Sequence, residues 1–380
     1  MTVEVETTEA PGAPARVSPL LALPGAVAAE GPDAGVAAHY GEPLKEQRAL
    51  AAGEAVVDGS NRGVIRVAGP DRLSWLDSIT SQRLLGLPPG GSAETLLLDP
   101  SGRVEHAAAV VDDGESAWLI TEAAEAAPFA AFLDRMRFLL RVTVEDVTDD
   151  WAVVAGVGPV PALPGAGPVW HDPWTATAEG GVTRAATDPH PGADFHQWFA
   201  LVPRGRLGEV AAAATGGGLR MAGTLALEAL RIAAWRPRFA REVDARSIPH
   251  ELDWLRSAVH LAKGCYRGQE TVAKVHNLGR PPRRLVQLDL DGSEAVLPTP
   301  GDAVLDGDQE VGSVTSAALH HEEGPIALAV VKRSVPETDG LVVRTPDADV
   351  AAAQRVIVPS DAGPAVAVPR LPRLGAVRRG

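Results

Sequence analysis

The sequence predicts an α+β protein that ends in a small β barrel. Residues 62–68 alternate between two sets of side chains and stop at Gly69-Pro70, a pattern typical of a strand. From Pro70 onward, apolar residues recur at helical spacing, so we expect a helix after that strand. After Arg283, short alternating runs are separated by turn-forming pairs such as Pro300-Gly301, which favours a barrel or a sandwich.

The remaining elements indicate the same fold class. Strands are predicted at 95–98, 104–111 and 117–121, and the turn-rich segments between them indicate hairpins. An apolar stripe of helical period predicts a helix over residues 129–140. Further strands are expected at 142–144, 198–202, 285–288, 312–315 and 326–331, and helices at 207–214 and 223–234. Helices that interrupt antiparallel strands indicate an α+β layer.

Length and composition suggest the domain organisation. The chain has 380 residues, enough for two or three structural units. Residues 1–34 are rich in Ala, Pro, Gly and Glu and lack a sustained periodicity, so we expect a flexible leader there. We expect an α+β region of one or two subdomains over residues 35–280, the barrel over 281–360 and a tail over 361–380.

Charge and hydropathy argue against several classes of protein. The chain carries 35 basic and 49 acidic residues, a net charge of -14, which argues against general nucleic-acid binding. No apolar run reaches the roughly 20 residues of a membrane helix, and the acidic N-terminus does not resemble a secretory signal. We therefore expect a soluble, cytoplasmic protein that does not bind membranes. A single Cys excludes an intrachain disulfide and an all-cysteine metal site.

Residues 263–277 concentrate the rare residues of this chain. They include the only Cys, one of two Tyr, one of two Asn and two of four Lys. Two glycines give the backbone around Cys265 conformational freedom, and Lys263 and Arg267 bring positive charge that favours a thiolate. This pattern predicts a reactive or ligand-binding cysteine. The alternative is a structural cysteine in a turn.

The octet Lys263–Glu270 closely resembles the signature of the YgfZ-type folate-binding proteins. These are relatives of the glycine-cleavage T-protein, the aminomethyltransferase that uses tetrahydrofolate. Supporting similarity lies at residues 38–41, 66–72, 97–103 and 229–231. The resemblance implies an α+β, aminomethyltransferase-like folate-binding region around a central channel, followed by a small β barrel. It also implies that tetrahydrofolate or another reduced folate is the cofactor.

The resemblance further implies which residues act. Cys265 is the expected functional thiol, with Lys263 as its electrostatic neighbour. T-proteins present an aspartate to the folate pterin from a Gly-Gly-Ile-Leu-Asp-type segment, and Glu105 lies at the similar place here. A carboxylate there can accept two hydrogen bonds from the pterin ring. The other expected folate contacts are Tyr266, Arg267, Gln269, Glu270 and Trp235.

One motif of the family is altered. Where T-proteins read Leu-Arg-Leu-Glu-Ala-Gly, residues 230–235 read Leu-Arg-Ile-Ala-Ala-Trp, so both the Glu and the Gly are lost. Losing a buried acceptor weakens ligand binding and orientation, so classical aminomethyl transfer is in doubt. Trp235 either stacks on a flat ring or packs in the core.

Other polar groups point less clearly to chemistry. A Cys-His nucleophile would need a histidine near Cys265, and the candidates are His250, His260 and His276. His320 and His321 are adjacent, so on a strand their side chains point to opposite faces, and we predict no metal site. Three arginines either meet an anionic group or form a solvated hinge: Arg280, Arg283 and Arg284.

The leading hypothesis is a folate-binding protein that supports assembly or repair of iron–sulfur clusters in client enzymes, including enzymes that modify tRNA. Its partners would then be folate and iron–sulfur client or assembly proteins. The first alternative is a tetrahydrofolate-dependent transferase of aminomethyl or methyl groups. The second is a folate-binding scaffold with an inert cysteine.

Overall fold

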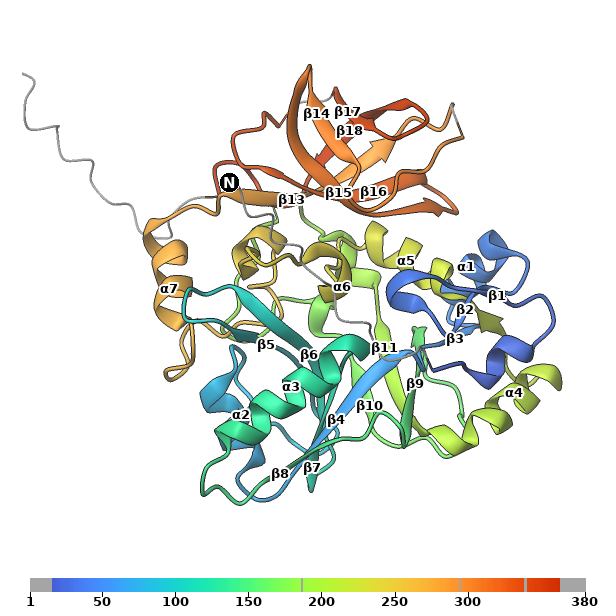
Figure 1. Cartoon of the computed structure of the whole chain (residues 1–380), viewed down its shortest axis with the longest axis vertical. Coiled ribbons are helices and arrows are strands. Elements are labelled where there is room, and N and C mark those ends of the chain that lie inside the picture. The colour runs from blue at the N-terminus through green and yellow to red at the C-terminus, as the bar shows by residue number, and fades with distance from the viewer. Residues whose placement is uncertain (1–15, 186, 294, 338–339, 363–380) are drawn as a thin grey trace, which may run out of the picture.

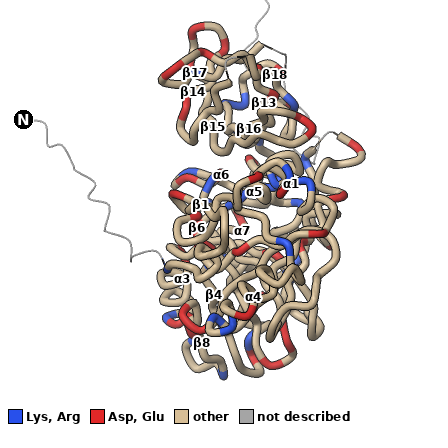
Figure 2. Tube along the Cα trace, turned by 90° about the vertical axis from the view of Figure 1, so that its right-hand side faces the viewer, with Lys and Arg blue, Asp and Glu red and all other residues tan. Residues whose placement is uncertain are grey.

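The computed structural model describes residues 16–185, 187–293, 295–337 and 340–362. Two five-stranded sheets and their helices form a body, and a β barrel lies against one end of it (Figure 1). Figure 2 shows the barrel as a separate lobe, with basic residues near α1, α5 and α6 on the adjacent part of the body.

The first sheet is antiparallel and forms from the predicted hairpins. Its strand order is β5 (Ser92–Leu98), β6 (Val104–Asp112), β7 (Ser116–Glu122), β4 (Arg62–Ala68) and β8 (Thr143–Asp146). The helices α2 (Arg72–Ile79) and α3 (Ala123–Met136) pack on one face. Ile65 and Val67 of β4 bury against Leu76 of α2 and Phe129 of α3, which explains the apolar periodicity of both helices.

The second sheet packs against the opposite face of the first. Its strand order is β10 (Val169–His171), β11 (Gln197–Pro203), β9 (Trp151–Val157), β3 (Val56–Asp58) and β12 (Met221–Ala222). Val64 and Trp118 of the first sheet share one core with Val153 and Phe199 of the second. The same core includes residues of α1 (Pro43–Ala51) and α5 (Thr224–Ala233), while α4 (Leu207–Thr215) covers a smaller cluster.

The barrel closes in the order β13, β16, β15, β14, β17, β18, so the predicted barrel is confirmed. Val286 and Leu288 of β13 belong to its apolar interior, and Leu285, the residue before Val286, packs on the body. The bounds of its strands are β13 (Arg283–Leu290), β14 (Ala303–Asp306), β15 (Gln309–His320), β16 (Gly324–Lys332), β17 (Leu341–Arg344) and β18 (Asp349–Val356).

Residues 16–34 are structured, so the prediction of a flexible leader is wrong for that stretch. It contains η1 (Pro19–Ala22), β1 (Val27–Ala28), which pairs with β2 (Ala37–His39), and η2 (Gly31–Asp33). Leu20 is buried against Ala152, Leu207 and Val210, and Asp33 is buried among arginines. Single buried residues of this kind produce no periodic hydrophobic pattern in the sequence. Residues 1–15 and most of the expected tail, 363–380, lie outside the described residues.

The structure also differs from the predicted elements elsewhere, and it contains α1 and β3, which the sequence analysis did not predict. The helix predicted over 129–140 spans 123–136, because Phe138 adopts a φ of 44°, in the left-handed region. Strand β9 was not predicted. Residues 263–278, the motif segment, contain helix α7 (Gln269–Leu278), which begins after Gly268 at a φ of 83°. Within the described ranges, every helix is too short or too polar to cross a membrane.

Candidate ligand-binding site

A cavity of about 70 Å³ lies between the two sheets. Its polar lining comes from four strands, α5 and the segment after α5, and comprises Arg62, Glu94, Thr121, Glu122, Gln197, Glu228, Arg231, Arg236 and Arg238. A second cavity of about 450 Å³ adjoins it, since Arg62, Glu122 and Phe239 line both. Residues 31, 32 and 34 form part of the wall of the second cavity, so the N-terminal segment encloses this site.

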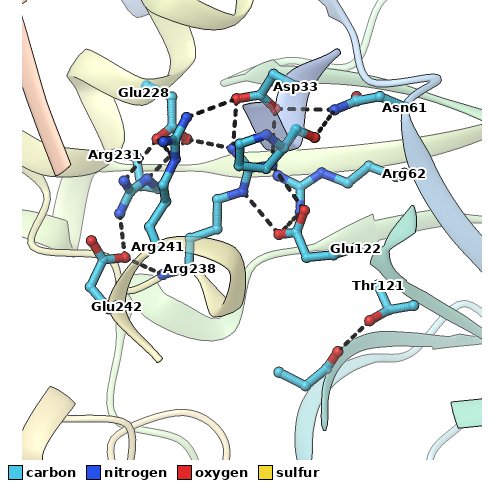
Figure 3. Close-up of polar contacts among 12 residues, drawn as sticks. Asp33, Asn61, Arg62, Thr121, Glu122, Glu228, Arg231, Arg238, Arg241 and Glu242 are labelled. Carbon is cyan, nitrogen blue, oxygen red and sulfur yellow. Dashed lines mark hydrogen bonds and ion pairs between the residues drawn. The ribbon is translucent and has the colours of Figure 1, made fainter. Parts of the chain in front are cut away.

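Arg238 is the centre of the buried charges around the cavity (Figure 3). Its guanidinium donates to both carboxylate oxygens of Glu122 at 2.9 Å and to Asp33 at 2.9 and 3.1 Å. It also donates to Glu228 at 3.2 Å. Arg238 therefore ties the N-terminal segment, the end of β7 and α5 to one side chain.

Two carboxylates beside Arg238, those of Glu122 and Glu228, are held in the ionised form. Burial alone would raise the pKa of Glu122, but Arg238 and Arg62 lower it to about 2. The pKa of Glu228 is likewise lowered, because Arg231 and Arg238 outweigh the effect of burial. The cavity wall is consequently a set of fixed, paired charges at neutral pH.

Arg231 connects this network to the barrel. It donates to Glu228 at 2.8 Å, to Glu242 of α6 (Phe239–Glu242) at 3.0 Å and to Ser316 of β15 at 2.7 Å. Ser316 in turn donates to Glu242 at 2.5 Å. The position of the barrel on the body is thus coupled to the charges that surround the cavity.

A second buried arginine closes another part of the wall. Arg236 pairs with Asp172 at 2.8 Å and with Glu94 at 2.7 Å. Glu94 also accepts hydrogen bonds from the Trp254 indole at 2.8 Å and from the Ser257 hydroxyl at 2.5 Å. The Glu94 carboxylate is therefore fully engaged within the protein.

Two polar side chains in the cavity keep free bonding capacity. The side-chain amide of Gln197 has no hydrogen-bond partner among the described residues, although the residue is only 7% exposed. Arg62 donates to Glu122 at 2.7 Å, and this is the hydrogen bond its guanidinium makes within the described ranges. The guanidinium lies 5.5 Å from the Phe199 ring, which stacks on Trp170. The cavity thus offers a free amide, a partly free guanidinium and an aromatic ring.

The predicted functional thiol lies elsewhere. Cys265 is exposed and lines neither cavity. The Lys263 ammonium is buried and donates to the backbone carbonyls of Thr80 and Gln82, each at 2.8 Å, and to that of Asp77. Burial lowers the pKa of Lys263 to about 8, although the Asp77 carboxylate opposes this shift. Lys263 therefore holds the turn after α2, and its role as an electrostatic neighbour of the thiol stays a prediction.

The expected folate contacts do not meet at the cavity. The Glu105 carboxylate pairs with Arg267, whose guanidinium lies over the Phe132 ring. The Gln269 amide donates to the Lys263 carbonyl at 3.2 Å. Tyr266 is buried in the core that faces the barrel, and Glu270 is exposed. None of these residues lines either cavity, so their placement does not support direct folate contact.

Trp235 belongs to the core between body and barrel. It is 3% exposed, and its indole donates to Gln287 of β13. Its φ of 57° lies in the left-handed region, which favours glycine. This backbone explains physically why a glycine suits the corresponding place in the T-protein motif. The packing of the indole favours the interpretation that Trp235 is a core residue over the interpretation that it stacks on a ligand.

The other sequence candidates are engaged within the protein. The His250 Nε2–H donates to the Val272 carbonyl at 3.1 Å, and burial lowers the pKa of His250 to about 3. His276 contacts Arg184 at 3.3 Å. Arg283 pairs with Asp244 and Glu251. Within the described ranges, no three His, Cys, Asp or Glu side chains are placed to hold a metal ion.

Comparison with known proteins agrees with this architecture. The GCVT N-terminal domain matches residues 36–162, and the glycine cleavage T-protein C-terminal barrel domain matches residues 283–359. An aminomethyltransferase of Saccharopolyspora erythraea is 29% identical over 315 residues, which cover 79% of this chain and 84% of that protein. A putative chloroplastic transferase of Arabidopsis thaliana is 25% identical over 284 residues, which cover 70% of this chain and 62% of that protein.

A solved structure shows the same fold. The glycine cleavage system aminomethyltransferase T from Bartonella henselae matches with a TM-score of 0.70 at 18% identity, over 90% of this chain and 95% of that one. The predicted aminomethyltransferase-like α+β fold with a C-terminal barrel is therefore confirmed. The chain carries a GCVT N-terminal domain and a T-protein C-terminal barrel domain, and it is a homologue of the aminomethyltransferases.

Proposed function

We propose that this protein binds a reduced folate in the two adjoining cavities. The observation that carries the proposal is the set of unused groups there: the Gln197 amide, the Arg62 guanidinium and the aromatic ring of Phe199. A flat heterocycle packs well on an aromatic ring, and a guanidinium binds carbonyl or carboxylate oxygens strongly. A folate supplies both kinds of group. When bound, it supplies a carrier for one-carbon units.

We further propose that the protein supports assembly or repair of iron–sulfur clusters in cytoplasmic client enzymes, including enzymes that modify tRNA, and that Cys265 is the functional thiol. The support is the similarity of Lys263–Glu270 to the YgfZ-type signature and the exposure of Cys265. One cysteine is too few for a four-thiolate cluster, so a client or assembly protein would supply the other ligands. The thiol and the folate would then act at separate places.

A one-carbon transferase is the second candidate function. The 29% identity to an aminomethyltransferase and the shared fold favour it. The loss of the Glu of the T-protein motif at Ala233 weighs against classical aminomethyl transfer. Turnover of an aminomethyl or methyl donor in the presence of tetrahydrofolate would establish the transferase. A folate-binding scaffold with an inert cysteine remains the third reading.

Calorimetric titration with 5-formyltetrahydrofolate, a stable reduced folate, tests the binding proposal. Arg62→Gln is expected to weaken binding by about 10- to 100-fold, because a hydrogen bond to a charged group is lost. Glu105→Ala is the matched control and is expected to leave the affinity unchanged, since Glu105 lines neither cavity. Absence of binding to the unmodified protein would refute the folate proposal.

Complementation of a strain defective in cluster assembly tests the role of the thiol. The full chain is expected to restore the activity of iron–sulfur enzymes, and Cys265→Ser is expected to fail while it remains folded and binds folate. Ser nearly preserves volume but does not ionise near neutral pH. A fully active Cys265→Ser variant would leave the scaffold reading.

A further inference from the structure

A cavity of about 880 Å³ lies between the body and the barrel, where α6 packs against β15 (Figure 1). We call it the barrel cleft, and its wall includes Arg103, residues 241–244 and residues 310–315. Among the described residues, it shares no lining residue with the two cavities of the proposed folate site. Ligand pockets span about 300 to 1,000 Å³, so the barrel cleft is large enough for an organic molecule.

Two arginines of the body meet at the barrel cleft. The Val104 amide donates to the Ser247 carbonyl at 2.9 Å, which joins the start of β6 to the loop after α6. Arg103 and Arg246 directly precede these two residues, and both are exposed and line the cleft. The fold therefore brings two cations from distant segments of the chain to one part of the wall.

The barrel supplies a third cation. Lys332 of β16 lines the cleft and pairs in register with Arg283 of β13. The Arg283 guanidinium reaches the body, where it donates to Asp244 at 2.6 Å and to Glu251 at 2.8 Å. Asp244 lies two residues before Arg246. These contacts place Lys332 on the barrel wall and Arg246 on the body wall of the same cavity.

Most of the carboxylates that line the barrel cleft are already engaged. Arg283 binds both Asp244 and Glu251, and Glu242 is held by the buried network described above. Their charges are therefore balanced within the protein. Glu310 is different, because its carboxylate makes no hydrogen bond or ion pair within the described ranges, and the residue is exposed.

The three cations of the barrel cleft are less well paired than these carboxylates. Among the residues that the structure describes, the Arg103 guanidinium makes no hydrogen bond or ion pair, and the Lys332 ammonium donates to the Glu310 backbone carbonyl at 2.8 Å. Arg246 lies 3.7 Å from the Asp244 carboxylate, and its side chain is 76% exposed. The cleft thus has an excess of available positive charge in a chain whose net charge is -14.

We propose that the barrel cleft binds a small organic molecule with two or more phosphoryl groups, such as a nucleoside diphosphate. Arginine and lysine bind phosphate oxygens strongly, and a phosphate ester carries about −1.5 to −2 charges at pH 7. A single carboxylate would balance only one of the three cations. Val243, Val311 and Pro300 also line the cleft and offer apolar surface to the organic part. This binding does not depend on the proposed folate site.

Calorimetric titration of the full chain with ADP and with inorganic pyrophosphate tests the proposal. Low ionic strength is required, because salt screens exposed charges. Both probes are expected to bind, and ADP is expected to bind more tightly, since its nucleoside covers apolar surface. Triglutamate, a carboxylate probe, is expected to bind more weakly than either. Tighter binding of triglutamate than of ADP would show that the cleft selects carboxylates, and the phosphate assignment would be wrong.

Arg246→Gln and Lys332→Gln each remove one cation, from the body wall and from the barrel wall. Each is expected to weaken ADP binding by about 10-fold, because a hydrogen bond between charged groups is lost. Arg220→Gln and Lys45→Gln are the matched controls, since these side chains lie outside the cleft and are 52% and 63% exposed. Equal losses in the controls would mean that ADP responds to overall charge, which contradicts a specific site.

Glu310→Gln tests the proposal in the opposite direction. The substitution removes the unpaired carboxylate, so the affinity for ADP is expected to rise by about 2- to 5-fold as a like charge is lost. A gain in affinity does not arise from a damaged fold. An unchanged or lower affinity would place the bound phosphates away from Glu310 and would overturn the proposed site.

Thermal unfolding separates loss of binding from loss of structure. Without ligand, Arg246→Gln and Lys332→Gln are expected to melt at the same temperature as the unmodified protein, because both positions are exposed. Saturating ADP is expected to raise the melting temperature of the unmodified protein more than that of either variant. Absence of binding of both ADP and pyrophosphate to the unmodified protein would refute the proposal and leave the folate proposal untouched.

Discussion

The buried network around Arg238 and the motif segment 263–278 are two regions with opposite properties. The network draws its side chains from positions as distant as Asp33 and Arg238, and every one of them is largely buried. The motif segment is continuous in sequence, and its cysteine is exposed. A dense run of rare residues therefore marked a surface feature, while the enclosed site is assembled from residues that carry no local signature.

Within the motif, two neighbours show the same contrast. Lys263 is 9% exposed and binds carbonyls at the end of α2, whereas Cys265 is exposed two residues later. The two rare residues are thus present for different physical reasons. Lys263 supplies a buried cation that the fold needs, and Cys265 supplies the accessible thiol that we propose is functional. The following experiments test which residues support the fold and which support the proposed function.

Removal of the N-terminal segment should have the largest effect. Deletion of residues 1–34 is expected to lower the free energy of unfolding by about 5 kcal/mol. The apolar contacts that Leu20 makes are lost with it, and Arg238 loses its partner Asp33. Deletion of residues 1–15 keeps every contact described above and serves as the control. Urea denaturation measures both. Equal midpoints for the two deletions would show that residues 16–34 contribute nothing to the fold.

Substitution of Arg238 is expected to follow in size. Arg238→Met removes the counter-charge that three buried carboxylates share and leaves each with a single type of partner, since Glu122 keeps Arg62, Glu228 keeps Arg231 and Arg241, and Asp33 keeps Arg241. We expect a loss of about 4 kcal/mol. Arg344→Ala on the barrel breaks an exposed pair with Asp349 and should change stability by less than about 0.5 kcal/mol. Comparable losses in the two variants would contradict the importance of the buried network.

Substitutions of Lys263 and Cys265 should have different effects on the free energy of unfolding in the same urea assay. Lys263→Met is expected to destabilise the protein by about 2 to 3 kcal/mol, because the Thr80 and Gln82 carbonyls lose a charged donor. Cys265→Ser, at an exposed position, should change stability by less than about 0.5 kcal/mol. The predicted role of Lys263 as the electrostatic neighbour of the thiol makes the alkylation of Cys265 slower in Lys263→Met than in the unmodified protein. An unchanged rate would limit Lys263 to its structural role.

The pH dependence of stability offers a smaller and more specific test. The pKa of Glu122 is lowered from 4.5 to about 2 in the folded protein, so its ionised form stabilises the fold at neutral pH. That contribution is lost as the pH falls through this range. Glu122→Gln is expected to show a shallower loss of stability between these pH values than the unmodified protein. Glu322→Gln, at a largely exposed side chain, should reproduce the unmodified slope.

Local patterns predicted much of the fold. The alternation at 62–68 corresponds to β4, and the turn-rich segments correspond to the hairpins of β5, β6 and β7. The end of α3 was missed because it depends on a distant contact. The Arg141 side chain and backbone amide are both held by Asp71, which fixes the exposed loop that contains Phe138. No periodicity near residue 138 carries that information.

The cavity was harder to predict than the fold. Arg62 appeared only as a polar residue in an alternating strand, and Gln197 preceded a predicted strand without a motif. A weak signal existed in Arg236-Pro237-Arg238, since two arginines follow a strongly apolar helix. Their partners, however, come from other segments of the chain, such as Asp172 and Glu122. Pairing over such separations is decided by tertiary packing rather than by local sequence.

The contact between Trp235 and Gln287 has an evolutionary consequence. The indole fills the boundary between body and barrel from a left-handed backbone position, and its N–H needs the Gln287 carbonyl oxygen because both are buried. A chain with glycine at position 235 has no indole to satisfy, so the carbonyl oxygen of an amide at position 287 would lose its donor, and the amide would keep only Asp289 and Glu323 as partners. We therefore expect positions 235 and 287 to covary among homologues, with Trp accompanied by a hydrogen-bond acceptor and Gly accompanied by apolar residues.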